Sequence, residues 1–370
     1  MQPRFLIRAA LALGTTLVIA LLVLSAHRPA QAVAVLTPGK ADLKSAGALT
    51  FGPDGVLFVG DSIGGAIVAL DTNDKTPAAT AAFNVQGLDA TIAGLVGVMP
   101  DQILINDVAV NPISKNVYVS AARGRGPDAV PLVVKVEPSG KVTPLSLDNI
   151  AHASVALVDA PAENPTARQN PRTTTITDME FINGNLLVTG MSNEEWNSAL
   201  RSIPYPFNSA GKGTQLQIWH ASHGRFETQA PVRTFVPYTL GGQSYVLAAY
   251  TCTPLVKIPM SDLKPGAQVK GVTIADLGSG NQPLDMVPYK KDGHEFILIA
   301  NSSFGVVKLH ADSLATDKPI DSPTVVSAAA GAPYDRITTL TNVQHLASVD
   351  AGHALVVTRG SVSLQTIALP

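Results

Sequence analysis

The sequence predicts an all-β protein, and three observations carry the prediction. A pattern of short apolar segments separated by Gly- or Asn-containing turns occurs six times along the chain. The 370 residues include 30 Gly and 27 Pro, which suits a fold with many tight turns. Helical patterning is restricted to residues 88–98 and, more weakly, to residues 149–158. With 46% hydrophobic and 15% charged residues, the chain is also too apolar for a disordered protein.

The N-terminal segment has the pattern of a secretory signal peptide. Two arginines precede an apolar run over residues 9–25, and the small-residue sequence PAQA ends at Ala32. This order predicts cleavage before Val33. An uncleaved membrane anchor is the alternative, although a run of about 17 residues is at the short limit for a span. We therefore expect residues 1–32 to be removed and residues 33–370 to form a single exported domain, periplasmic or secreted, with no membrane segment.

The charge balance excludes two classes of partner. Removing residues 1–32 takes away three Arg and no acidic residue, which leaves 23 basic and 28 acidic side chains and a net charge of −5. Nucleic acid and anionic membrane surfaces are therefore not expected as partners. We expect a monomer that binds a small molecule or another protein.

Four antiparallel strands per repeat, arranged radially, form a β-propeller, so six repeats predict six blades. The innermost strands are expected to begin near Ala48, Asp107, Asp178, Thr234, Asp285 and Val343. Fourth strands are expected at residues 141–145 and 269–274, but the last repeat ends after its third strand. We therefore expect residues 33–36 to close the last blade as its outer strand, which would remove the exposed strand edges.

The strand order, the number of repeats and turns such as FGPDG at residues 51–55 resemble the six-bladed propellers of the gluconolactonase, paraoxonase and NHL-repeat group. The resemblance covers the chain after residue 32 and rests on architecture. It implies one of three roles: a metal-dependent lactonase, a lyase or a non-catalytic binding scaffold.

One face of the ring is expected to carry the site, because the innermost strands start there and the loops between second and third strands open there. Asp107, Asp178, Asp285 and Asn342 are expected at these strand starts. Oxygen ligands from separate strands suit Ca²⁺. In a lactonase-like reaction the cation would polarise a carbonyl, and Asp107 or Asp178 would act as the general base. The alternative is that each Asp only accepts hydrogen bonds from backbone N–H groups.

The loops between second and third strands offer further candidate ligand-binding residues: Arg123, Arg125, Asn193, Glu194, Cys252, Asn301 and Arg359. Two arginines on a Gly-rich loop form a fork suited to a carboxylate, phosphate or sulfate. Alternatively, Arg123 or Arg359 pairs with the axial carboxylates. The aromatic segment at residues 191–207 is predicted to be a lid over the channel, or else a plug that fills a gap.

Cysteine and histidine give weaker signals. Cys252 is the only cysteine, so it cannot form an intramolecular disulfide, and it is a nucleophile, a soft-metal ligand or a buried thiol. His220 and His223 are expected on the opposite face, where their spacing has no function.

Together these features predict an exported propeller that binds a small polar or anionic ligand at the channel mouth. Ca²⁺ is the expected cofactor and lactonase-like hydrolysis the expected chemistry. The alternative is a non-catalytic scaffold for protein partners, and the sequence leaves open whether the chain is an enzyme.

Overall fold

The computed structural model describes residues 36–164, 166–251, 254–278, 280–324 and 329–370. The predicted signal peptide and Cys252 lie outside these ranges. Ala34–Pro370 cluster as one compact unit. No helix within the described ranges is long and apolar enough to cross a membrane.

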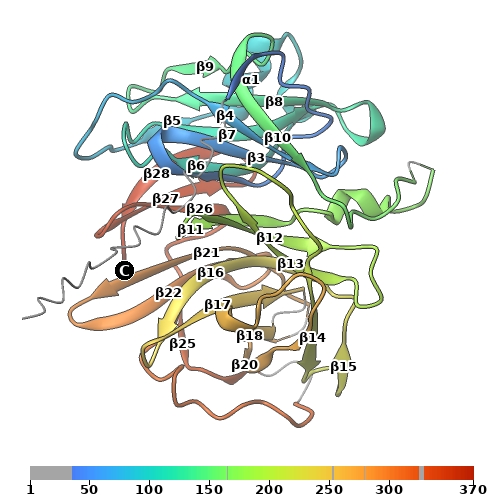
Figure 1. Cartoon of the computed structure of the whole chain (residues 1–370). Coiled ribbons are helices and arrows are strands. Elements are labelled where there is room, and N and C mark those ends of the chain that lie inside the picture. Colours follow the sequence, from blue (N-terminus) through green and yellow to red (C-terminus); the bar gives the residue numbers. More distant parts are fainter. Residues whose placement is uncertain (1–35, 165, 252–253, 279, 325–328) are drawn as a thin grey trace, which may run out of the picture. The chain divides into compact units, whose positions relative to one another are not determined.

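The described strands form six sheets, which are the blades of a β-propeller (Figure 1). Blade 1 contains β2 (Leu49–Phe51), β3 (Val56–Asp61), β4 (Ala66–Asp71), β10 (Ile150–Ala156) and β1 (Thr37–Gly39), from the axis outward. Blade 2 contains β6 (Ile103–Val110), β7 (Val117–Arg123), β8 (Val130–Val136) and β9 (Val142–Pro144). Blade 3 contains β11 (Asp178–Ile182), β12 (Asn185–Met191), β13 (Ser198–Pro204), β14 (Thr214–His220) and β15 (Arg225–Glu227), and β19 (Gln268–Lys270) lies parallel to β14.

The other three blades are built in the same way. Blade 4 contains β16 (Val232–Leu240), β17 (Gln243–Tyr250), β18 (Pro254–Pro259), β20 (Val272–Asp276) and β24 (Ala330–Gly331). Blade 5 contains β21 (Pro283–Lys291), β22 (His294–Asn301), β23 (Gly305–His310) and β25 (Tyr334–Ile337). Blade 6 contains β26 (Val343–Asp350), β27 (His353–Thr358), β28 (Ser363–Ala368) and β5 (Asn84–Gln86). One α-helix, α1 (Leu88–Val96), is described, with 3₁₀ turns at Pro53–Gly55, Pro100–Gln102, Gly126–Asp128, Pro171–Thr174 and Met260–Asp262.

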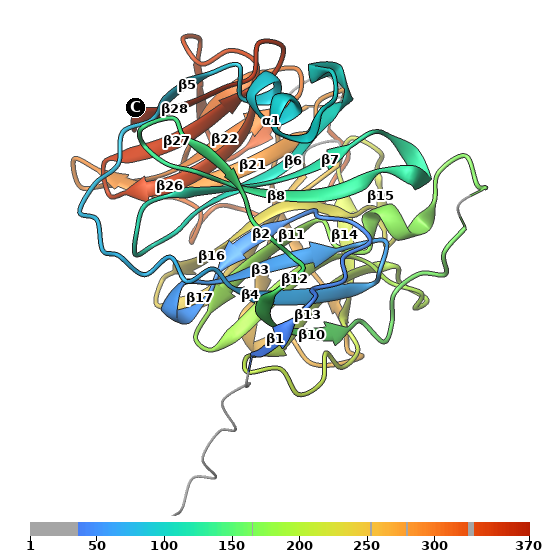
Figure 2. The same ribbon diagram turned by 90° about the horizontal axis from the view of Figure 1, so that it is seen from above.

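The blades do not follow one another around the ring in chain order. The innermost strands contact one another in the closed order β2, β6, β26, β21, β16, β11 and back to β2. Blade 1 therefore lies between blades 2 and 3, and blade 2 lies beside blade 6. In Figure 1 the red strands of blade 6 lie beside β6, and in Figure 2 the blue strands of blade 1 lie beside the cyan strands of blade 2.

The hydrophobic core follows this permuted order, because each apolar cluster fills the space between two spatially neighbouring blades. Leu88 and Val108 pack with Leu355 between blades 2 and 6. Phe58 packs with Met179 between blades 1 and 3. Apolar alternation along each strand buries one set of side chains against each neighbouring blade.

The permuted order arises because two blades are completed by strands from elsewhere in the chain. After β4 the chain leaves blade 1, forms β5 on the outer edge of blade 6, and then builds blade 2. After β9 it returns to blade 1, where β10 pairs with β4 on one side and β1 on the other. The chain passes from β5 in blade 6, through α1, to β6 in blade 2, and from β10 in blade 1 to β11 in blade 3, so each of these steps joins blades that are neighbours in space.

The predicted closure of the ring is therefore wrong. Residues 33–35 lie outside the described ranges, but Leu36 packs against the cluster between blades 1 and 3, and the next three residues form β1 in blade 1. The outer strand of blade 6 is β5, with Gln86 opposite Ser363. The edge of β28 is therefore paired by an internal segment, and β1 lies in blade 1, which is not a neighbour of blade 6.

Three predictions of local structure also need correction. The helix expected at residues 88–98 is confirmed as α1, but residues 149–158 form the strand β10, whose Ile150 and Val155 are buried in the core. The fourth strand expected at residues 141–145 is confirmed as β9, whereas the one expected at residues 269–274 is divided between β19, which pairs with β14 of blade 3, and β20, the fourth strand of blade 4. In blade 3 the third strand is β13, and the segment expected to be third is the fourth strand β14.

The segment predicted as a lid is consequently part of the blade. Arg201 in β13 is fully buried, and its Nε donates to Asp159 Oδ1 at 2.7 Å. Its Nη1 and Nη2 donate to the carbonyls of Thr175 and Met191 at 3.2 and 3.0 Å. Tyr205 packs edge-on against Phe58 of blade 1, with ring centroids 4.9 Å apart. The aromatic side chains thus fill the gap between blades 1 and 3, as in the plug alternative.

The role of β5 can be tested with two proline substitutions. Val85 is 7% exposed and pairs with Leu364, so Val85→Pro removes a ladder hydrogen bond and buried contacts. We expect it to lower the free energy of unfolding by about 3 kcal/mol. Thr37→Pro, at the exposed outer strand β1, is the matched control and should have a much smaller effect on the thermal unfolding midpoint. Equal destabilisation by both variants would contradict closure by β5.

Candidate functional site

Three aspartates hold the innermost strands together in pairs. Asp107, Asp178 and Asp285 occupy the same register position in β6, β11 and β21, which belong to every second blade around the ring. The Oδ1 atoms accept hydrogen bonds of 2.7–2.8 Å from the next backbone N–H in the same strand. The Oδ2 atoms accept equally short bonds from the N–H groups of Leu49, Phe235 and Leu346 in the neighbouring innermost strand. The blades are therefore coupled as 2 with 1, 3 with 4, and 5 with 6.

A β-bulge lies at the entrance of four of the six innermost strands. The pairing register shifts by one residue just before Asp107, Thr234, Asp285 and His345 in four of the innermost strands. A bulge leaves one residue outside the ladder and re-aims its neighbours. The bulge residues include Arg233 and Gln344, and both line the axial cavity.

His345 occupies in blade 6 the position that aspartate occupies in blades 2, 3 and 5. Its Nδ1 lies 3.6 Å from Asp107 Oδ1 and 3.9 Å from Asp285 Oδ2. Its Nε2 is buried and has no hydrogen-bond partner among the described residues. Burial lowers the pKa of His345 to about 4, so the imidazole is neutral at physiological pH. The sequence pattern did not single out His345.

Asn342, the predicted ligand from blade 6, lies outside the group. It is exposed, precedes the start of β26, and has a left-handed φ of 57°. Its carbonyl accepts the Arg359 N–H at 2.7 Å. The aligned repeats placed it at the aspartate position, but the register of β26 assigns that position to His345.

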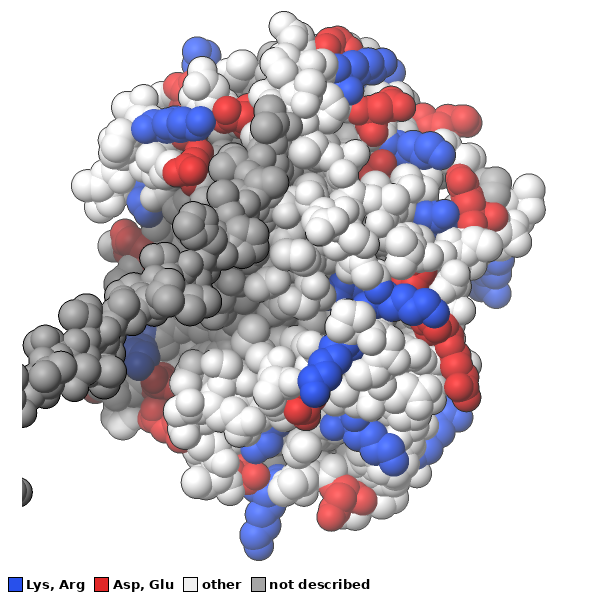
Figure 3. Space-filling model, viewed as in Figure 1, with Lys and Arg blue, Asp and Glu red and all other residues white. Residues whose placement is uncertain are grey.

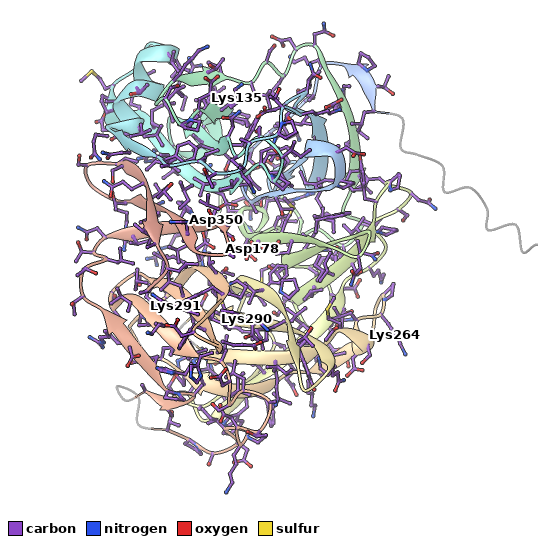
Figure 4. All side chains as sticks on the ribbon, turned by 90° about the vertical axis from the view of Figure 1, so that its left-hand side faces the viewer. Lys135, Asp178, Lys264, Lys290, Lys291 and Asp350 are labelled. Carbon is purple, nitrogen blue, oxygen red and sulfur yellow. The ribbon has the colours of Figure 1, made fainter. Side chains whose placement is uncertain are left out.

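The entrances of the six innermost strands enclose an axial cavity of about 270 Å³. The lining residues are Ala48, Leu104, Ile105, Asn106, Asp107, Thr177, Asp178, Arg233, Thr234, Leu284, Asp285, Gln344 and His345. In Figure 4 Asp178 lies among the strands in the interior, whereas Lys264 lies at the periphery. All six blades thus contribute to one polar cavity.

Acidic side chains outnumber basic ones in and beside the cavity, and their mutual proximity and burial raise their pKa values. Burial, and then the charge of Asp178, raise the pKa of Asp107 to about 8. Burial alone raises the pKa of Asp178 to about 6, and burial with the charges of Asp107 and Asp178 raises the pKa of Asp285 well above its usual range. Burial, and then the same two charges, raise the pKa of Glu180 in β11 to about 8.

Arg233 is the cation that faces these acids. Burial lowers its pKa, and the charge of Asp178 partly offsets that effect. Its Nε is buried without a hydrogen-bond partner among the described residues. The predicted axial partners, Arg123 and Arg359, are both exposed, and neither lines the cavity. Arg233 was not singled out in the sequence because its position on the axis depends on the bulge in β16.

The other predicted ligand-binding residues do not converge on the axis. Arg123 and Arg125 are exposed, and Arg125 donates to the Asp101 carbonyl at 3.2 Å. Arg359 donates to the Ser302 carbonyl at 3.1 Å. On the face in Figure 3 basic and acidic side chains are intermixed.

Three more of these residues also lie away from the cavity. Asn193 is exposed, and Glu194 pairs with Lys212 at 2.7 Å. Asn301 is buried and accepts a hydrogen bond from Asn281 at 2.9 Å, which indicates a structural role. Cys252 remains outside the described residues.

The donor set at the axis fits a divalent cation. Asp107, Asp285 and His345 each offer a ligand atom, and these atoms lie within 4.8 Å of one another. A carboxylate oxygen that accepts one N–H bond keeps a second lone pair, so the backbone bonds do not exhaust the aspartates. Carboxylates suit Ca²⁺, whereas an imidazole favours a first-row transition metal.

Similarity to known proteins is found among solved structures. No protein-family model and no curated protein matches the chain. Among solved structures, a glucose dehydrogenase is 12% identical, with 91% of this chain and 99% of that chain covered and a TM-score of 0.36. The soluble aldose sugar dehydrogenase of Escherichia coli is 12% identical (90% and 99% covered, TM-score 0.32), and a streptogramin B lyase is 9% identical (90% and 97% covered, TM-score 0.31). All three are β-propellers, and the six-bladed arrangement seen here agrees with the resemblance found in the sequence.

Proposed function

We propose that the axial cavity binds a divalent cation through Asp107, Asp285 and His345, and that the chain is an exported hydrolase of small cyclic esters. The observation that carries the proposal is the convergence of these groups in one cavity, together with the excess of buried acids over Arg233. Like charges brought together in a buried site are relieved by a bound cation or by protons.

The proposed reaction is the hydrolysis of a lactone. A bound cation would polarise the carbonyl and make water more acidic. Asp178 lies in the same cavity but outside the proposed ligand group, and its raised pKa of about 6 suits a general base at neutral pH. It would accept the proton of the attacking water and return it to the alkoxide when the ring C–O bond breaks.

Arg233 would orient the substrate in this cavity. Its unpartnered Nε gives it a free N–H donor beside the proposed base. A guanidinium binds carboxylate and oxyanion oxygens strongly when water is excluded. The substrate class is therefore a small oxygen-rich lactone, which fits a cavity of about 270 Å³.

A non-catalytic scaffold is the second candidate. The observation that favours it is that both oxygens of each axial aspartate already accept backbone hydrogen bonds. In that case the aspartates only join blades, and a flat face would bind a protein partner. Cation binding and catalysis distinguish the two candidates.

Cation binding should stabilise the protein. With Mn²⁺, Zn²⁺ or Ca²⁺ at a hundredfold excess over its dissociation constant, the free energy of unfolding should rise by about 2.7 kcal/mol relative to EDTA. His345→Ala and Asp285→Asn should abolish the rise in the thermal unfolding midpoint that Ca²⁺ or Mn²⁺ causes. Asn342→Gly, which suits the left-handed φ there, should keep it. A midpoint that responds to none of the three cations would remove the cation from the proposal.

Catalysis should depend on Asp178. We expect the purified protein with its cation to hydrolyse five- or six-membered lactones in a pH-indicator assay. Asp178→Asn should lower kcat by about 10²–10⁴-fold while the thermal response to the cation remains. Turnover that is unaffected by this variant would exclude Asp178 as the base, and no turnover of any lactone would favour the scaffold.

Stability in EDTA should increase as the pH falls. The pKa of Asp107 is raised from 3.8 to about 8, so this acid binds protons more tightly in the folded protein than in the unfolded chain. The unfolding midpoint should therefore rise between about pH 8.5 and about pH 5, and the gain should be lost as pH rises through the raised pKa. Asp107→Asn should flatten this dependence, and saturating cation should do the same in the parent. An equally steep rise in Asp107→Asn would show that other groups cause it.

A further inference from the structure

A second cluster of metal-ligand residues lies at the outer edge of blade 3. His220 ends β14, and the turn to β15 brings His223 back over it, with the two ring centroids 3.8 Å apart. In the β14–β15 ladder Ile218 is opposite Glu227 and His220 is opposite Arg225. Because side chains alternate along a strand, Glu227 and His220 lie on the same face of this hairpin as diagonal neighbours. Trp219 and Phe226 pack together on the other face.

The cluster lies at the same end of the propeller as the axial cavity. It borders a cavity of about 490 Å³ that is also lined by Pro231 and Thr251. Pro231 immediately precedes β16, and Thr251 immediately follows β17, so both lie at the end of blade 4 where Arg233 enters the axial cavity. The expectation that His220 and His223 lie on the opposite face is therefore wrong. It assumed that β14 was a third strand.

The three side chains converge closely. The Nδ1 atoms of His220 and His223 lie 2.7 and 2.8 Å from the two carboxylate oxygens of Glu227. One ligand atom from each residue lies within 4.8 Å of the other two. A tetrahedral zinc ion with bonds of about 2.0–2.1 Å needs ligand atoms about 3.3 Å apart, so small rotations of these side chains suffice.

His220 also has a ring nitrogen that makes no hydrogen bond within the described residues. It is 1% exposed, and its Nε2 is buried without a hydrogen-bond partner among the described residues. A buried imidazole nitrogen without a hydrogen-bond partner costs free energy. Glu227 contacts the Nδ1 atom of His220, so it does not satisfy Nε2. The ring can therefore turn to meet a metal ion without giving up a hydrogen bond at Nε2.

We propose that His220, His223 and Glu227 form a second metal site, of the zinc class and separate from the axial cation. Two imidazoles and a carboxylate prefer first-row transition metals such as Zn²⁺ to Ca²⁺. Three protein ligands leave a fourth position open, and the adjoining cavity gives that position access to water or to a small anionic ligand. A metal ion bound at the Nδ1 atoms would replace their hydrogen bonds to Glu227, and each neutral imidazole would then carry its proton on Nε2.

Arg225 competes with a metal ion for the carboxylate of Glu227. Its Nε donates to Glu227 Oε1 at 2.9 Å, and its side chain is 70% exposed. The hydrogen bonds from the two histidines and Arg225 outweigh the effect of burial and hold the pKa of Glu227 at about 2, so the carboxylate is ionised and ready to bind a cation. Since Arg225 competes for this carboxylate, its removal should strengthen metal binding.

The test measures zinc binding in a variant without axial ligands. In the full chain carrying Asp107→Asn and His345→Ala, calorimetric titration with Zn²⁺ should give one site per chain. Adding His223→Ala or Glu227→Gln should weaken that site at least 100-fold, whereas adding Arg225→Ala should tighten it. His223 and Arg225 are both at the surface, so the comparison does not depend on disrupting the core.

Two further measurements complete the test. Cys252→Ser is titrated in parallel, because the single thiol is another potential zinc ligand, and it should leave the affinity unchanged. Co²⁺ in place of Zn²⁺ should give the strong visible absorption of a four-coordinate ion, lost in Glu227→Gln. The proposal is overturned if micromolar Zn²⁺ does not bind to the axial variant, or if His223→Ala and Glu227→Gln bind it as tightly as their parent. Because the variant lacks the axial ligands, the result of this titration does not depend on whether the axial cavity binds a cation.

Discussion

The hydrogen bonds from backbone N–H groups to Asp107, Asp178 and Asp285 are the interactions on which the centre of the molecule depends. Each carboxylate joins its own strand to the innermost strand of the next blade, so three side chains couple all six blades. The same bonds bring three acids to one axis, where burial raises their pKa values. Structural coupling and the charge of the cavity therefore come from the same atoms. For that reason asparagine, which keeps the shape and one acceptor oxygen, is the informative substitution.

The sequence was sufficient to predict the propeller, the number of blades and the three axial aspartates. Strands and turns are recognised from short stretches of sequence, and the same pattern occurs six times along the chain. The order of the blades is not local, because it depends on where the three-residue strand β5 finds an edge. His345 was missed because the last repeat was aligned on Asn342, an oxygen-bearing side chain, which lies three residues before the position that the register of β26 assigns to His345. Arg123, Arg125 and Arg359 do not line the axial cavity, and the sequence could not show this because loop length says little about where a long side chain ends.

The two proposed metal sites differ in the chemistry of their surroundings. The axial site has an excess of acids from separate blades, and its stability depends on the whole ring. The second site, formed by His220, His223 and Glu227, lies within eight consecutive residues of one hairpin, and Arg225 already forms an ion pair with its carboxylate. A cation at the axis would relieve repulsion between the aspartates, whereas a metal ion at the second site must compete with the hydrogen bonds that Glu227 already accepts. The two sites should therefore respond differently to pH and to the choice of metal.

The permuted blade order has a consequence for how the chain folds. Phe83, just before β5, donates its N–H to Thr366 Oγ1, 283 positions along the chain. Blade 1 likewise cannot be completed until β10 is available. Contacts between residues so far apart in sequence make folding slow, because the loops between them must close first. During synthesis the edge of β4 stays unpaired until the second blade has emerged, and β5 stays without its partner until the last strand is made. Unpaired strand edges can pair with other chains, so these two edges are the places where aggregation would begin before their partners are made.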